Sequence, residues 1–125
     1  MIYIYSKKMQ KKFVIIDNDQ LLNDLIEEQV SIVFEKNFTV KFLKNYNIDS
    51  LNAFDTVDLI IVNFKFIKDN YKILINLANE KKSKIIFMFD DGVDRSQLKK
   101  FSNYNFVVKP FKLKQLIDII KDFFI

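Results

Sequence analysis

The chain has 125 residues, the usual length of one domain, and half of them are apolar, so it can bury a core of its own. It contains no Cys, no His and a single Gly, which excludes disulfides, imidazole and thiolate metal sites, Ser-His-Asp triads and glycine-rich phosphate loops. The net charge of +4, from 20 Lys and Arg against 16 Asp and Glu, is a modest excess that is typical of a solvated surface.

Short apolar runs alternate along the chain with longer segments in which apolar residues recur at helical spacing. The first kind predicts strands covered on both faces, and the second predicts amphipathic helices. In chain order the pattern predicts strand 13–16, helix 19–34, strand 38–43, helix 48–54, strand 57–62, helix 67–79, strand 85–89, a weak helix 94–101, strand 106–108 and helix 112–124. Strand 38–43 alternates apolar and polar residues, as an edge strand does.

This alternation of strands and helices predicts one α/β domain over residues 1–125. The expected architecture is a three-layer α/β/α sandwich, with a parallel five-stranded sheet in the flavodoxin-like order 2-1-3-4-5. Residues 1–11 form a head of uncertain structure. No apolar run is long enough to cross a membrane, and Met1–Tyr5 is too short for a signal-peptide core, so we expect a cytoplasmic protein.

Polar residues follow the predicted strands at the edge where open α/β sheets carry their sites. In strand order they are Asp17, Asn18 and Asp19, then Asn63, then Asp90 and Asp91, then Lys109 with Pro110. We expect the acids after the first strand to converge with Lys109. Asp19 is also placed to cap the first helix.

These strand ends resemble, in order and spacing, those of the receiver domains of response regulators in two-component signalling. The resemblance covers residues 12–124 and rests on four strings: Phe13–Asp19, Asp58–Asn63, Lys84–Phe89 and Phe106–Phe111. It implies paired acids after the first strand, a phosphoacceptor Asp at position 63, a hydroxyl at 89 and a Lys at 109. It also implies a switch aromatic at Phe106, which turns inward when the hydroxyl residue moves.

Three positions depart from that pattern. Asn63 stands where the phosphoacceptor belongs, and a neutral amide is a poor nucleophile. Asn18 replaces an acid that ligates Mg²⁺ in the family, so we expect Mg²⁺ binding to be weak or absent and no other metal or cofactor. Phe89 removes the hydroxyl, and its ring is expected to fill part of the pocket. The sequence therefore predicts an atypical pseudo-receiver that is not an enzyme and does not take phosphate.

The remaining pocket residues have structural interpretations beside the functional ones. Asp17 is either a remnant of a metal site or, as we favour, a buried acid paired with Lys109. Asn63 is expected to hydrogen-bond Lys109 and the neighbouring loop. Phe106, with no hydroxyl partner, is expected to keep one ring orientation or simply to serve as a core side chain.

The expected function is signalling by protein–protein contact, as an adaptor or a dimerisation module. Because the chain ends with its last helix, output is expected to come from a partner. A homodimer through the fourth helix, fifth strand and fifth helix of the fold would use Ile119 and Phe123, which equally well extend the buried stripe of the last helix.

Two alternatives stay open. One is a phosphate-responsive or enzymatic receiver with noncanonical chemistry, whose acids and base would be Asp17, Asp19, Asp90, Asp91 and Lys109. The other is weak nucleic-acid binding through the Lys-rich head, at Lys7, Lys8, Lys11 and Lys12. Nucleic acid is disfavoured because Arg95 is the only Arg.

Overall fold

The computed structural model describes residues 10–35, 37–44, 51–52 and 56–125. Its elements, in chain order, are β1 (Lys11–Ile16), α2 (Gln20–Phe34), β2 (Phe38–Leu43), β3 (Leu59–Asn63), the 3₁₀ turn η1 (Phe64–Phe66), α4 (Tyr71–Lys81), β4 (Lys84–Phe89), α5 (Arg95–Lys100), β5 (Asn105–Val108) and α6 (Leu113–Phe124). The five strands are parallel and lie in the order β2-β1-β3-β4-β5. The predicted fold class and strand order are confirmed.

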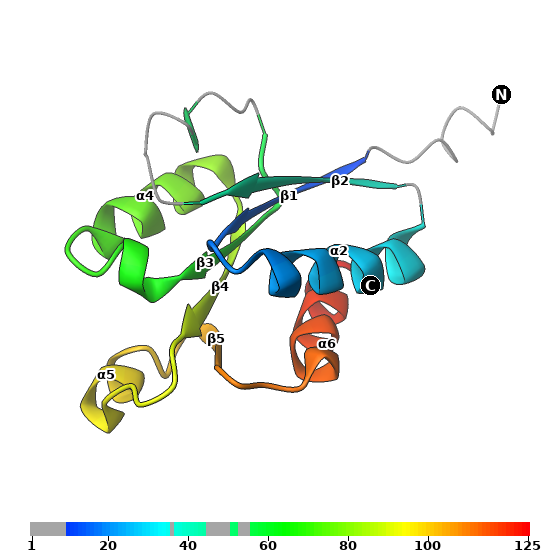
Figure 1. The fold of residues 1–125 in the computed structure, drawn as a ribbon. Coiled ribbons are helices and arrows are strands. Elements are labelled where there is room, and N and C mark those ends of the chain that lie inside the picture. Colours follow the sequence, from blue (N-terminus) through cyan, green and yellow to red (C-terminus); the bar gives the residue numbers. More distant parts are fainter. Residues whose placement is uncertain (1–9, 36, 45–50, 53–55) are drawn as a thin grey trace, which may run out of the picture.

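Helices cover both faces of the sheet (Figure 1). On one face, α2 and α6 pack through Ile26, Val30, Leu116, Ile117 and Ile120 against alternate strand residues. On the other, α4 packs through Leu74 and Leu77, and Phe101 follows α5 into the same core. The central strands β1 and β3 are buried almost throughout, as expected of continuous apolar runs in a parallel sheet.

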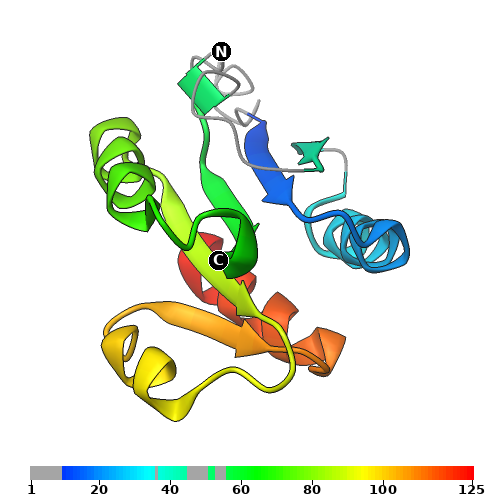
Figure 2. The same ribbon diagram turned by 60° about the vertical axis from the view of Figure 1, so that its left-hand side comes forward.

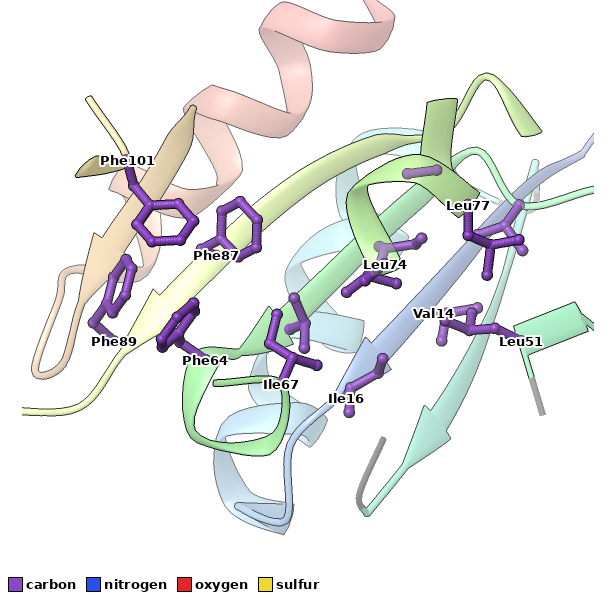
Figure 3. Close-up of a cluster of buried hydrophobic side chains, with 14 residues drawn as sticks. Val14, Ile16, Leu51, Phe64, Ile67, Leu74, Leu77, Phe87, Phe89 and Phe101 are labelled. Atoms are coloured by element: carbon purple, nitrogen blue, oxygen red, sulfur yellow. The ribbon is translucent and has the colours of Figure 1, made fainter. Parts of the chain in front are cut away.

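The core on the α4 and α5 face is divided by side-chain type. Figure 3 shows aromatic rings gathered at the carboxyl end of β4, with Phe64, Phe87, Phe89 and Phe101 close together, while aliphatic side chains fill the space nearer β1. The ring centroids of Phe87 and Phe101 are 4.9 Å apart, and those of Phe64 and Phe89 are 5.1 Å apart. The aromatic group therefore lies beside the strand ends where the candidate site was expected.

The segment after β3 differs from the sequence prediction. The helix predicted at 67–79 begins only at Tyr71, and η1 occupies the residues directly after Asn63. Asn63 is the cap of η1, because its side-chain Oδ1 accepts a hydrogen bond from the backbone N–H of Lys65 at 3.1 Å. Ile67 is fully buried below this turn. Local capping and burial thus outweigh the helical periodicity that starts at Ile67.

The amino-terminal boundary also differs from the prediction. Lys11 and Lys12 belong to β1 rather than to the head, because they pair with Phe38 and Thr39 of β2. The backbone N–H of Lys12 also donates to Asp58 Oδ2 at 2.7 Å. Residues 1–9, including Lys7 and Lys8, lie outside the described residues, as does most of the helix predicted at 48–54. Of that helix, residues 51–52 are described and are helical, and Leu51 is buried.

Candidate functional site

Asp17, directly after β1, is the buried centre of the strand-end cluster, and its side chain has 0% exposure. Its Oδ2 accepts a hydrogen bond from Lys109 Nζ at 2.8 Å, and its Oδ1 accepts one from the backbone N–H of Asp19 at 3.0 Å. A buried carboxylate is tolerated when charged and hydrogen-bonding partners replace water. The predicted pairing of Asp17 with Lys109 is confirmed.

Lys109 directly follows β5, an edge strand that is separated from β1 by β3 and β4. Its backbone N–H donates to the carbonyl oxygen of Phe89 at 2.8 Å, which extends the contact between β4 and β5 past the strand ends. Its ammonium group also lies 3.9 Å from Asp19 Oδ2. Asp19 caps α2, since its Oδ1 accepts from the backbone N–H of Leu22 at 3.1 Å, so the predicted cap is confirmed.

Asn23 is a buried polar residue that the sequence reasoning missed. It lies on the sheet-facing side of α2, and its Nδ2 donates to the backbone carbonyl of Asp17 at 2.9 Å. This bond ties α2 to the loop that carries Asp17. A signal was available, because Asn23 occupies the core-facing position three residues before Ile26 and seven before Val30.

Asn63 is fully buried at the end of β3, and its amide joins two acids. Its Nδ2 donates to Asp90 Oδ1 at 3.0 Å and lies 3.4 Å from Asp17 Oδ2. A side-chain amide has two N–H groups, so it can offer one to each carboxylate. The expected bond from Asn63 to Lys109 is absent among the described residues. Both groups are donors toward this space, and Asp17 lies between them as their shared acceptor.

Asp90 and Lys65 continue the network on the other side of Asn63. Lys65 Nζ lies 3.8 Å from Asp90 Oδ2, in a half-exposed pair. The contacts therefore connect five side chains in a row, in the spatial order Lys65, Asp90, Asn63, Asp17 and Lys109. Along this row the groups are positive, negative, neutral, negative and positive. Asp90 was a candidate in the alternative of a phosphate-responsive or enzymatic receiver, and Lys65 was not singled out. Lys65 could have been found from the sequence, because it is a cation two residues after Asn63, the position at which the resemblance expects the phosphoacceptor.

Phe89 packs into the aromatic group instead of offering a polar group to the cluster. Its side chain is 2% exposed, and its ring lies 5.7 Å from that of Phe106, edge to face. Phe89 also lines a cavity of about 450 Å³ together with Asn63, Lys65, Tyr71 and other residues of η1, α4 and the loop after β4. Phe106 is half-buried against the same core. The expectation of one ring orientation for Phe106 stays a prediction.

The residues present do not fit the Mg²⁺ site that the receiver resemblance implies. Mg²⁺ needs several oxygen ligands in octahedral geometry, with carboxylates preferred. Here the Asn63 amide directs donors, not an acceptor, toward Asp17 and Asp90, and Asn18 is exposed. In the part of the chain that the structure describes, no group of three or more acids is arranged to hold a metal ion.

The two α6 residues proposed for an interface are half-buried. Ile119 and Phe123 both pack against the core between the sheet and α6. Lys84 Nζ lies 5.7 Å from the centroid of the Phe123 ring, in a cation–π arrangement. These contacts agree with an extended buried stripe and leave a homodimer as a proposal.

Of the four lysines proposed for nucleic-acid binding, the structure describes Lys11 and Lys12, and both lie in β1. Lys11 Nζ lies 5.3 Å from the centroid of the Phe124 ring, and Lys12 is anchored by its backbone to Asp58. Among the described residues, the helices are too short or too polar to cross a lipid bilayer.

The arrangement of strands and helices is that of response-regulator receiver domains. A response regulator from Thermotoga maritima matches with a TM-score of 0.72 and 15% identity, over 92% of this chain and 98% of that one. The signal receiver domain of a putative Luxo repressor protein from Vibrio parahaemolyticus matches with a TM-score of 0.67 and 13% identity, over 92% and 90%. A two-component response regulator from Clostridium difficile matches with a TM-score of 0.64 and 20% identity, over 91% and 95%.

At these identities the likeness is one of fold. No family model matches the sequence, and no curated protein matches it. The chain therefore has a receiver fold in which an amide and a phenyl ring stand at the strand ends, at Asn63 and Phe89.

Proposed function

We propose that the protein is a degenerate receiver that signals by protein–protein contact and does not accept a phosphoryl group. The observation that carries the proposal is the position of the Asn63 amide between Asp17 and Asp90. In phosphoryl transfer to an acid, a carboxylate oxygen attacks the phosphorus atom of the donor. A cation neutralises the negative charge on the phosphoryl oxygens and on the acids around them. Here the neutral amide occupies the place of the nucleophile, and its N–H groups hydrogen-bond to the two acids without adding positive charge.

The surroundings of Asn63 support the same proposal. Lys109 is held at 2.8 Å by Asp17, and Lys65 lies near Asp90, so each cation already has an anionic partner. Phe89 is packed among aromatic rings and has no hydroxyl to hold a phosphoryl oxygen. A bound phosphoryl group would have to break this paired network without forming the usual new contacts. We propose one stable pocket state that presents a constant surface to a partner.

The experiment is to incubate the full chain with acetyl phosphate and Mg²⁺ and to measure its intact mass. Beryllofluoride, which mimics an acyl phosphate, is added to a second sample and followed by NMR. We expect no phosphoryl adduct and no shift of the amides around Asn63. An adduct mapped to any side chain of the cluster, or stoichiometric beryllofluoride binding at micromolar Mg²⁺, would overturn the proposal.

A dimerisation role is the second form of the proposal. The half-buried Ile119 and Phe123 are where it would act, and light scattering of the full chain at high micromolar concentration tests it. A dimer that is lost in Phe123→Ser supports this form, and a monomer leaves the adaptor form.

A further inference from the structure

The cavity of about 450 Å³ beside the strand-end cluster has an aromatic wall, because the rings of Phe64, Tyr71 and Phe89 line it. It lies among η1, the start of α4 and the loop that leads from β4 to α5. Figures 1 and 2 show α4 and α5 on the same side of the sheet, away from α6. Cavities of this size, lined by aromatic side chains and a few polar groups, are typical of sites for small molecules.

A second cavity, of about 330 Å³, adjoins the first at Tyr71 and Lys100, which line both. Tyr104 forms part of its wall and is 41% exposed. The ring centroids of Tyr71 and Tyr104 lie 5.2 and 5.9 Å from that of the buried Phe101. Contacts with a core ring therefore hold two tyrosines in place, and these offer a surface on which a flat ring can stack.

The cations around the two cavities have no acidic partner. Lys68 and Lys100 line the first cavity and are exposed, and neither forms an ion pair with a residue that the structure describes. The same holds for Lys72, in the wall of the second cavity. None of the described residues that line this second cavity is acidic. These ammonium groups are therefore free to bind an anion from outside the chain.

Two of the three acids that line the first cavity are already engaged. Asp90 accepts a hydrogen bond from Asn63. Asp94 Oδ2 accepts one from Ser96 Oγ at 2.8 Å. Asp91 is exposed and is the acid that remains. The unpaired charge around the cavities is therefore mainly positive, which favours an anion over a cation as the ligand.

We infer that the two cavities form one binding site for a small planar aromatic anion. The ring stacks on the aromatic surface around Tyr71. The anionic group pairs with Lys100, which borders both cavities, and with Lys68. Lys109 takes no part, because it is paired with Asp17 at 2.8 Å. Binding at this site goes beyond the proposed function and does not depend on it.

The test is a titration of the ¹⁵N-labelled full chain with 2-naphthalenesulfonate, followed by amide NMR. One control compound is 2-naphthalenemethanol, which has the ring without the charge, and the other is sulfate, which has the charge without the ring. We expect saturable shifts of the amides around Tyr71 and Lys100 with the sulfonate. Each control compound should bind about tenfold more weakly, because it lacks one of the two kinds of contact.

Two pairs of lysine substitutions separate the site from a general effect of charge. In Lys68→Gln/Lys100→Gln the affinity for the sulfonate should fall about fivefold or more, because both free cations of the first cavity are lost. Lys112→Gln/Lys121→Gln is the matched control. It removes the same charge from exposed positions at α6, on the other face of the sheet, and should bind as wild type does.

Four outcomes would overturn the inference. They are no saturable binding at millimolar sulfonate, equal losses in the two lysine pairs, sulfate binding as tight as that of the sulfonate, and equally tight binding of the neutral ring. The phosphorylation assay is separate from this titration. A phosphoryl adduct defeats the proposed function without touching this site, and a failed titration leaves the proposed function intact.

Discussion

Lys109 Nζ and Asp17 Oδ2 lie 2.8 Å apart, although β5 and β1 are separated in the sheet by β3 and β4. The pair connects the carboxyl ends of β1 and β5. The same oxygen, Asp17 Oδ2, also lies 3.4 Å from the amide nitrogen of Asn63. The two residues are 92 positions apart in sequence, and the side chain of Asp17 has no exposure to solvent.

The first prediction concerns this pair. Lys109→Met leaves the buried carboxylate of Asp17 without its cation, and the free energy of unfolding should fall by about 3 kcal/mol. Urea unfolding followed by circular dichroism measures it. Lys114→Met is the control, because Lys114 pairs with Asp118 at the surface and should cost at most about 0.5 kcal/mol. Equal costs for the two variants would contradict a structural role for the Lys109–Asp17 pair.

The second prediction concerns charge balance around position 63. Asn63→Asp places a third carboxylate between Asp17 and Asp90 and removes both N–H donors, so the protein should lose about 2 kcal/mol of stability. Millimolar Mg²⁺ should restore part of it, because a cation then offsets the three acids. Thermal unfolding with and without Mg²⁺ measures both effects, with wild type as the Mg²⁺-insensitive control. An unchanged melting temperature in the variant would show that the amide contacts contribute nothing.

The third prediction is that Asn63→Asp alone is not phosphorylated by acetyl phosphate. Asn18 is still an exposed amide and Phe89 still lacks a hydroxyl, so the acceptor carboxylate has neither a full ligand set nor a partner for the phosphoryl oxygen. Intact mass spectrometry after incubation with Mg²⁺ reads the result. Efficient phosphorylation of this single variant would mean that Asn18 and Phe89 matter less than proposed here.

The fourth prediction concerns the aromatic group. Phe89→Ala removes a ring that contacts Phe64, Phe101 and Phe106, and should cost about 3 kcal/mol through the cavity it leaves. Phe106→Ala, at a half-buried position, should lower the free energy of unfolding by less. Urea unfolding of the two variants measures the difference.

The orientation of the Phe106 ring is tested separately. Aromatic NMR should show one environment for the Phe106 ring in wild type and broadened signals in Phe89→Ala. Two resolved Phe106 environments in wild type would contradict a single ring orientation.

The sequence predicted the sheet and its order because continuous apolar runs and intervening helical periods are local signals. The starts of the helices predicted at 19–34 and 112–124 match the structure to within a residue, the first because Asp19 is a cap and the second because the apolar periodicity begins at Leu113. The start of α4 was wrong by four residues, because a buried turn capped by Asn63 overrides the periodicity.

The sequence predicted that Asp17, Asn63 and Lys109 lie at the same edge of the sheet, but it missed Asn23 and Lys65 and predicted only some of the contacts. The Asp17–Lys109 pair followed from the need of a buried charge for a counter-charge. The bond between Asn63 and Asp90 did not, because it depends on how the loop after β4 folds back, and that loop carries no distinctive spacing. Asn23 could have been found, since a polar residue on the core face of a helix signals a buried hydrogen bond.

The aromatic group also gives the protein an optical reporter. The chain has no Trp, and two of its five Tyr, Tyr71 and Tyr104, lie 5.2 and 5.9 Å from the Phe101 ring. Tyrosine side chains held in a fixed asymmetric setting produce near-ultraviolet dichroism. Loosening of the α4 and α5 side of the domain would therefore be visible in solution without any label.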